Sequence, residues 1–212
     1  MKIIDLSQTF ENGMPQFPNT KPIKIEQIAQ IREGGFRVTD LQSTVHNGTH
    51  CDAPAHCIEG GKTIDQLSLD TFVGEAIMLD ADVEEKREIS TEILEGVEIQ
   101  PKDIVIIRTG YSKYWGQERY VYDAPYLSEE LAQSLSNLDI KSIGIDFISP
   151  DKVDSIRSSV HNILMKENIP FIENLNNLDK IKKERFFFSA APLLIYKSDG
   201  GLARAFAVIF DE

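Results

Sequence analysis

The sequence is poor in histidine, cysteine and positive charge, and it contains no long apolar run. Its 212 residues include four histidines and two cysteines, and 22 Lys and Arg residues stand against 34 Asp and Glu, for a net charge of −12. Since no stretch approaches the roughly eighteen consecutive apolar residues of a membrane span, we expect no membrane partner. We also expect no nucleic-acid partner, because affinity for the phosphate backbone comes largely from Lys and Arg.

The two cysteines, Cys51 and Cys57, are too few for a disulfide scaffold. We interpret them as reduced, packed thiols, with a disulfide bridge or metal ligation as the alternative. The first ten residues, MKIIDLSQTF, lack the long apolar run of a signal peptide, so a cytoplasmic location is expected.

Length and composition predict one domain over residues 1–212, since 42% hydrophobic and 26% charged residues are ordinary for a globular protein. Eight segments have the length and alternation of strands: 2–8, 36–45, 75–81, 103–110, 141–147, 185–190, 193–197 and 204–210. Four segments have helical patterns: 90–97, 128–135, 155–168 and 174–183. Residues 82–100 are acidic and typical of a surface excursion. A mixed α/β fold with a strand-rich core follows.

The segment HNGTHCDAPAH, residues 46–56, holds three of the four histidines. A helix is disfavoured there by a glycine and a proline. In an extended chain, the shared parity of His46, His50, Asp52 and His56 places all four side chains on one side. Two neutral imidazoles and a carboxylate are a common ligand set for a catalytic divalent metal. Histidines without a shared role are the alternative, and the in-phase aspartate favours the metal site.

The remaining histidine, His161, lies on a predicted helix, and Glu173 closes the short apolar strand IPFIE. Each has an ordinary structural explanation, as a histidine on a helix face and as an acid at a strand end. Spacing alone does not show whether either residue reaches the first cluster.

The eleven-residue segment matches the pattern H-x-G-T-H-x-D-x-P-x-H, and through it the chain resembles the cyclase-like family of metal-dependent hydrolases. That family includes bacterial kynurenine formamidases and isatin hydrolases. The resemblance continues through IIDLSQTFENGMPQFPNTKP, IRTGYSKYW, SIGIDFISPD, IPFIENLNNL and the block from APLLIYKSDGG into RAFAVI. It implies the family's swivelling β/β/α fold and assembly as a homodimer or homotetramer.

The resemblance also divides the site residues between metal binding and proton transfer. It implies His56 as the unliganded acid/base and five metal ligands: His46, His50 and Asp52 on one ion, with Asp52 bridging to a second ion held by His161 and Glu173. Kynurenine formamidase-like members carry an acid at the position of Glu173 and bind two zinc ions. Isatin hydrolase-like members have an amide side chain there and use a single manganese. Two Zn²⁺ ions per chain are therefore implied, with Mn²⁺ as the alternative.

The implied activity is that of an arylformamidase, which converts N-formylkynurenine to kynurenine and formate. Metal-activated water would attack the amide carbonyl, and His56 would protonate the departing nitrogen. Phe17, an aromatic residue before a proline, is the candidate substrate-binding residue. Tyr111, Tyr114 and Trp115 would extend an aromatic wall, with ordinary packing as the alternative for these residues.

One departure from the family pattern leaves the substrate open. This chain has GGLARA, residues 200–205, where kynurenine formamidase-like proteins tend to have Gly-Ser-Pro before Arg-Ala. A cyclic amide, a lactone or a small carbamoyl compound is the alternative substrate within the family. Outside it, two histidines and a carboxylate also fit a non-haem iron oxygenase or a metal-stabilised binding module without turnover.

Overall fold

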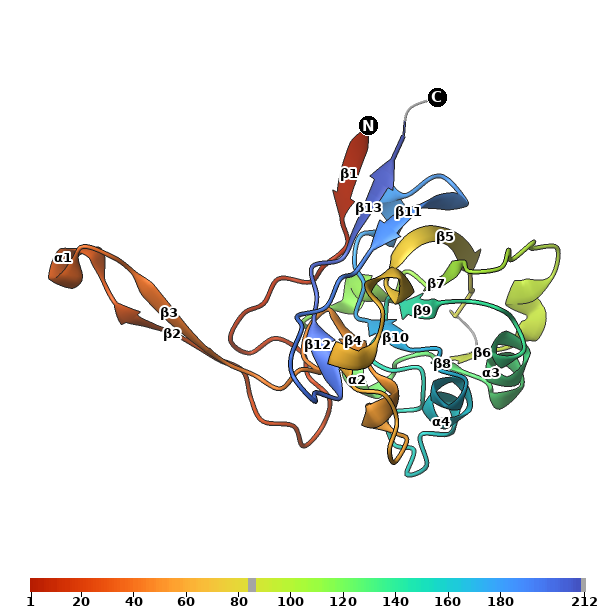
Figure 1. Ribbon diagram of the computed structural model, residues 1–212, viewed down its shortest axis with the longest axis horizontal. Helices are drawn as coiled ribbons and strands as arrows, with labels where there is room; N and C mark the ends of the chain where they lie inside the picture. The colour runs from red at the N-terminus through yellow and green to blue at the C-terminus, as the bar shows by residue number, and fades with distance from the viewer. Residues whose placement is uncertain (84–86, 211–212) are drawn as a thin grey trace.

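The computed structural model describes residues 1–83 and 87–210, and it is built around one large, curled β-sheet (Figure 1). The nine strands of this sheet are ordered β1-β13-β11-β5-β7-β9-β10-β4-β12. Their bounds are β1 Lys2–Asp5, β4 His50–Asp52, β5 Val73–Asp80, β7 Ile104–Arg108, β9 Ser142–Ile145, β10 Phe171–Glu173, β11 Arg185–Ser189, β12 Gly200–Leu202 and β13 Phe206–Ile209. The expected mixed α/β class with a strand-rich core is confirmed.

The centre of the sheet is parallel and is buried on both faces. Strands β5, β7, β9 and β10 pair in parallel, while the strands toward both edges pair antiparallel. Alternate side chains of β7 enter separate apolar clusters: Val105 and Ile107 pack in one, and Ile104 and Ile106 in the other. The sequence of a strand that is buried on both faces is continuously apolar, which explains the run IVII in β7.

Two helices cover one face of the sheet, and they lie side by side in Figure 1. Helix α3, Glu129–Ser136, begins at Ser128, whose hydroxyl accepts a hydrogen bond from the backbone N–H of Leu131. Helix α4, Ser159–Lys166, has a left-handed N-cap without a side-chain cap of its own. Its first N–H groups donate instead to the carboxylate of Asp151, a residue outside the helix.

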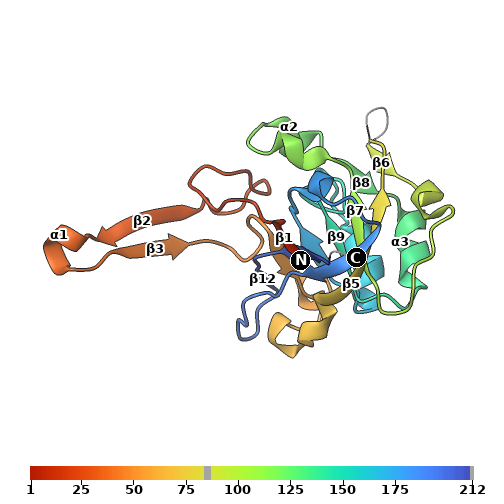
Figure 2. The same cartoon turned by 90° about the horizontal axis from the view of Figure 1, so that it is seen from above.

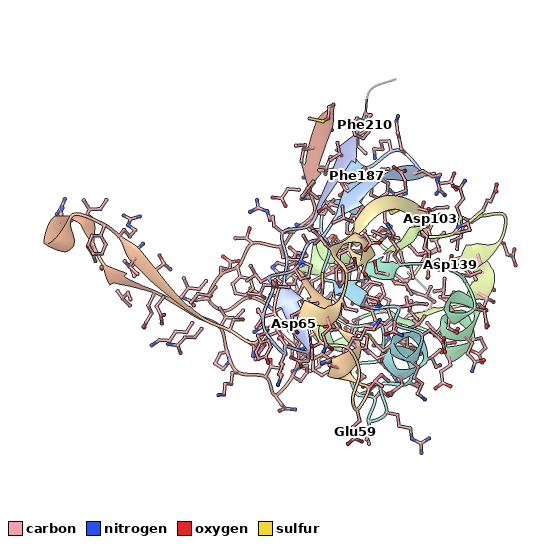
Figure 3. All side chains as sticks on the ribbon, viewed as in Figure 1. Glu59, Asp65, Asp103, Asp139, Phe187 and Phe210 are labelled. Atoms are coloured by element: carbon pink, nitrogen blue, oxygen red, sulfur yellow. The ribbon has the colours of Figure 1, made fainter. Side chains whose placement is uncertain are left out.

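A two-stranded ribbon projects from the body, as Figures 1 and 2 show from two directions. It consists of β2, Lys24–Ala29, and β3, Val38–Gln42, joined through the short helix α1, Ile31–Gly34. In Figure 3 the side chains of this ribbon stand clear of the rest of the molecule, whereas the labelled Phe187 and Phe210 lie toward the end of the sheet that carries both termini.

The remaining elements are short. Strands β6, Glu88–Ile89, and β8, Tyr126–Leu127, form a small parallel pair, and helix α2 spans Arg119–Tyr122. Within the surface excursion expected over residues 82–100, residues 84–86 lie outside the described residues; the remainder holds β6 and a single 3-10 turn at Thr91–Leu94. Among the described residues, no helix is long and apolar enough to cross a membrane.

Most expected strands are present, but one is wrong, and three of the four expected helices are shorter than expected: 90–97 holds only the 3-10 turn Thr91–Leu94. Residues 193–195 have no regular structure and residues 196–197 form a turn, with Leu194 81% exposed. The segment contacts β12 at its start, through the bridge of Pro192 with Ala203 and a hydrogen bond from the N–H of Leu193 to the carbonyl of Leu202. Of 174–183, only Leu178–Lys180 is helical, as a 3-10 turn, since Asn174 and Asn177 adopt left-handed conformations. Residues 155–158 precede α4 rather than belonging to it.

A buried hydrogen-bond chain ties the body to the histidine segment. Tyr120, which is fully buried, donates its hydroxyl to Asn174 Oδ1 at 2.8 Å, and Asn174 Nδ2 donates to the carbonyl of Gly48 at 3.0 Å. Asn174 also accepts at its own carbonyl from the hydroxyl of Thr49. The chain therefore connects the core to the backbone between His46 and His50.

We predict that Tyr120→Phe lowers the free energy of unfolding by about 1–3 kcal/mol, because it leaves a buried acceptor on Asn174 without its donor. Urea denaturation measures the loss. The control is Tyr122→Phe, whose side chain is 60% exposed and should show no change. Equal stabilities for the two variants would contradict the structural role of this chain.

Candidate metal centre

The histidine segment is not one extended strand, so the expectation of a single period-two stretch over 46–56 is wrong. Residues 45–49 form turns and bends, His50–Asp52 form strand β4, and Pro54–His56 form a 3-10 turn. The four side chains nevertheless converge, because the bends on either side of β4 return His46 and His56 toward the same end of the sheet. Their ring centroids lie 4.0 Å apart.

Two glycines allow the segment to bend and to pack. Gly48 has a φ of +59°, and a Cβ on it would lie 2.9 Å from the ring of Phe10. Gly200, on β12, pairs with Asp52, and a Cβ there would meet the carbonyl oxygen of Cys51 at 2.8 Å and Cε1 of His46 at 2.9 Å. The ring of His46 therefore rests directly against the backbone of the neighbouring strand.

Asp52 is the centre of the site. Its carboxylate is 1% exposed and is approached by three imidazoles. Oδ1 lies 2.7 Å from His46 Nδ1 and 3.2 Å from His50 Nε2, and Oδ2 lies 3.4 Å from His161 Nε2. The structure thus brings the fourth histidine to the first cluster, across a separation of 109 residues.

Glu173 completes this arrangement from strand β10. The register pairs Glu173 with His50 across adjacent strands, and His50 Nε2 lies 3.5 Å from Glu173 Oε2. On the other side, His161 Nε2 lies 3.5 Å from Glu173 Oε1. Buried carboxylate and imidazole side chains from β4, β10 and α4 therefore meet at one point.

The orientation of two histidine rings is fixed by their other nitrogen. His50 Nδ1 donates to the carbonyl of Gly48 at 2.9 Å, and His161 Nδ1 lies 2.5 Å from the carboxylate of Asp151. Each contact fixes the tautomer, and this leaves Nε2 directed at Asp52 and Glu173. Histidines that bind metals in proteins are held in this way by a carbonyl or carboxylate on the far nitrogen.

His56 stands apart from the buried ligands. Its side chain is 33% exposed, compared with 1% for His50, and its Nδ1 lies 3.4 Å from Asp199 Oδ2. The same oxygen of Asp199 lies 2.9 Å from His46 Nε2. By distance alone, His56 belongs to two possible metal-binding groups. Its ring nitrogen lies within 4.8 Å of ligand atoms of His46 and Asp199 in one group, and of Asp52 and His161 in the other. Its exposure is what distinguishes it.

The charges in the cluster depend on one another. Burial disfavours the charged ring of His46, but the carboxylates of Asp52 and Asp199 outweigh burial and raise its pKa to about 9. Burial acts on His161 in the same way, and its carboxylate neighbours raise its pKa well above the ordinary value. Burial would raise the pKa of Asp52, yet the surrounding histidines hold it well below its usual range. Glu173 has a raised pKa, owing to burial and to the charge of Asp52.

Two buried atoms in the cluster have a charged neighbour within 3.5 Å but make no well-directed hydrogen bond. These are His50 Nε2 and Glu173 Oε1, both of which border a cavity of about 260 Å³. An unpaired buried donor or acceptor costs about 1–3 kcal/mol, so it is normally satisfied by protein, water or an ion. Both atoms are types that bind divalent metals.

The cavity is lined by the five expected metal ligands, by His56 and by Phe17. Phe17, 36% exposed, lies at its wall together with His46, His50, Asp52, His56, His161 and Glu173. Tyr111, Tyr114 and Trp115 do not border it. They pack with Tyr120 in the apolar cluster beneath α3 and α4, so the aromatic wall is wrong for these three residues and ordinary packing explains them.

Sequence reasoning missed Asp151 and Asp199. Asp151 ends the quoted segment SIGIDFISPD, in the loop between β9, which ends at Ile145, and helix α4, and no spacing pattern connects it to His161. Asp199 precedes Gly200 and Gly201, but nothing in the spacing connects it to the histidines, 143 residues from His56. Both cysteines are free thiols; Cys51 is buried, and Cys57 is partly buried.

Comparison with known proteins identifies the family. The cyclase family model, described as "Putative cyclase", matches residues 4–152. Kynurenine formamidase of Bacillus cereus is 32% identical over 206 residues, which cover 95% of each chain. The chain belongs to the cyclase family, and within it this protein is a hydrolase.

Solved structures support the same fold. A protein described as "predicted metal-dependent hydrolase from Bacillus stearothermophilus" is 27% identical with a TM-score of 0.82, and 97% of each chain is covered. Isatin hydrolase A of Ralstonia solanacearum superposes with a TM-score of 0.87 at 24% identity, covering 99% of this chain and 92% of its own. The latter similarity is evidence for the fold alone.

We predict that Gly200→Ala displaces β12 from β4 or shifts the ring of His46, because the new methyl group would lie within 3 Å of the carbonyl oxygen of Cys51 on β4 and of Cε1 of His46. Unfolding by heat should begin at a lower temperature, and any hydrolytic activity should fall. Gly34→Ala is the control, since a Cβ there would meet only the ring of Phe36 at 3.8 Å. A Gly200→Ala protein as stable and as active as the control would contradict the close packing of His46.

Proposed function

We propose that the protein is a metal-dependent amidohydrolase, most specifically an arylformamidase that cleaves N-formylkynurenine to kynurenine and formate. One observation carries the proposal: a buried carboxylate, Asp52, lies between two sets of donors within 3.5 Å. Similarity to kynurenine formamidases over almost the whole chain supports the substrate.

The residues present fit a pair of divalent ions. His46, His50 and Asp52 would hold one ion, and Asp52, His161 and Glu173 would hold the other. The atoms His50 Nε2 and Glu173 Oε1 support this assignment, because each lacks a well-directed hydrogen bond and would gain a partner. Nitrogen and carboxylate donors suit Zn²⁺, and Mn²⁺ is the alternative ion.

A metal ion bound there would act as a Lewis acid and lower the pKa of a coordinated water toward about 7. The protein's own contribution is orientation and proton transfer. Asp151 and the carbonyl of Gly48 hold His161 and His50 in fixed tautomers, so these rings do not act as proton carriers. His56, which is exposed to the cavity, would protonate the departing amide nitrogen, since an amine leaves poorly without a proton.

The cavity suits a small acyl amide. Its volume of about 260 Å³ lies near the lower end of known ligand sites. Phe17, which lines the cavity, would pack against an aryl ring. The acid at Glu173 favours the dinuclear, formamidase-like assignment over the single-manganese, isatin hydrolase-like alternative.

We predict different results for the acid/base and the ligands. His56→Ala should keep its metal and lose roughly two to four decades of rate, the usual range for a general acid or base. His50→Ala should lose metal, because its Nε2 would no longer be available. Elemental analysis after dialysis, paired with steady-state kinetics, separates the two outcomes. A His56→Ala protein without metal would show that His56 is a ligand.

The proposed substrate is tested by a hydrolysis panel with the zinc-loaded and manganese-loaded protein. N-formylkynurenine should be cleaved faster than isatin or a simple formanilide, and chelation should abolish cleavage. Faster opening of isatin with one manganese per chain would assign the alternative substrate. Oxygen-dependent turnover with ferrous iron would instead assign an oxygenase.

We also propose that the protein forms a homodimer through the ribbon β2–β3. An isolated two-stranded hairpin is only marginally stable in water, and exposed apolar side chains on a projection mark an interaction surface. Ile28, Ile31 and Phe36 on this ribbon are 61–64% exposed. Residues 24–42 carry three basic residues, Lys24, Arg32 and Arg37, and three acidic ones, so the ribbon has no net charge in a chain of net charge −12 and meets a second copy without the repulsion of two acidic surfaces.

We predict a dimer for the full chain by light scattering, and a monomer when residues 25–41 are replaced by a short Gly-Ser linker. The milder double variant Ile28→Ser, Phe36→Ser should also weaken the dimer. Leu69→Ser is the control, since Leu69 is equally exposed at 61% but lies outside the ribbon. A full-length monomer, or a dimer that survives loss of the ribbon, would contradict this assembly.

A further inference from the structure

Asp199 lies beside the histidine segment, where backbone hydrogen bonds and strand pairing fix its position. Its backbone carbonyl accepts from the N–H of Ala53 at 2.8 Å, and the preceding residue, Ser198, accepts from Ile64 at 2.8 Å. The next residue, Gly200, pairs with Asp52 in the sheet. Asp199 is therefore held in register with the strand that carries the central carboxylate.

A single oxygen of Asp199 serves two imidazoles. Oδ2 lies 2.9 Å from His46 Nε2 and 3.4 Å from His56 Nδ1. On His46, the opposite nitrogen faces Asp52 Oδ1 at 2.7 Å. On His56, the opposite nitrogen, Nε2, has no hydrogen-bond partner among the described residues, and the ring borders the cavity.

We propose that Asp199 is a positioning residue for His56. By accepting from Nδ1–H, it holds the ring in the tautomer that presents Nε2 to the cavity, where the substrate would exchange a proton. Its contact with His46 Nε2 anchors the carboxylate beside the two rings, whose centroids lie 4.0 Å apart. The proposal rests on the proposed hydrolytic role of His56.

The geometry favours positioning over metal ligation for Asp199. Its side chain is 48% exposed, whereas the carboxylate of Asp52 is 1% exposed. A carboxylate behind an imidazole is a common arrangement for fixing a tautomer, both at metal sites and in catalytic triads. Ligation by Asp199, together with His46 and His56, remains a separate outcome of the test.

The first test uses Asp199→Asn in the metal-loaded protein, with Asp65→Asn as the matched control. Asp65, labelled in Figure 3, accepts at 3.0 Å from the backbone N–H of Lys197 and so anchors the same turn without contacting a histidine. We expect Asp199→Asn to lower kcat roughly 10–100-fold, with KM within about twofold and the metal content unchanged. Asp65→Asn should keep kcat within about twofold.

Further loss of rate should be absent when Asp199→Asn is added to His56→Ala, because the carboxylate acts through that ring. An additive loss, or an equal loss in Asp65→Asn, would overturn the positioning role. Loss of metal from Asp199→Asn would show that the carboxylate acts on the metal site, as a ligand or through its 2.9 Å contact with His46, and would overturn the role toward His56 as well.

The second test does not depend on catalysis. Nitrogen-15 NMR of the histidine side chains reports which nitrogen of His56 carries the proton. We expect the Nδ1–H tautomer in the unaltered protein and in Asp65→Asn, and a shift toward Nε2–H in Asp199→Asn. The same tautomer in all three proteins would overturn the proposal. If the protein cleaved no amide but the tautomer shifted as expected, the proposed function would fail while the positioning contact stood.

Discussion

The site depends on the burial of one carboxylate, that of Asp52. A buried charge is costly unless it is paired, and here the pairing comes from three imidazoles, in the turn before β4, in β4 itself and in helix α4. These rings need fixed orientations in turn, which are supplied by the carbonyl of Gly48 and the carboxylates of Asp151 and Asp199. The cluster is thus arranged in layers around Asp52, and each outer group constrains the nitrogen that faces inward.

The sheet supplies the positions that this arrangement requires. Strand β4 enters between β10 and β12, so that Glu173 pairs with His50 on one side and Gly200 with Asp52 on the other. Helix α4 carries His161 to the site, and the N-terminus of this helix is capped by the same Asp151 that orients the ring of His161. Residues far apart in sequence therefore meet because the antiparallel strands β4 and β12 pair beside the parallel centre of the sheet.

Sequence reasoning reached the centre of the site through the type and spacing of its residues. An aspartate in phase with three histidines indicated a metal cluster, and the resemblance to a hydrolase family connected His161 and Glu173 to it. Local rules failed where tertiary contacts decide the conformation. The extended path over residues 46–56 was wrong because Gly48 adopts a left-handed turn, and 193–197 bends because β12 must pair with β4. Asp199 was missed because its partners are set by that pairing and by no local pattern.

The central claim is that Asp52 joins two metal ions held by separate sets of donors. Anomalous diffraction at the zinc absorption edge, from crystals of the zinc-loaded protein, tests this claim most directly. The account predicts two peaks flanking the carboxylate of Asp52, one in contact with His46 and His50 and the other with His161 and Glu173. A single peak, or peaks that do not touch Asp52, would contradict it.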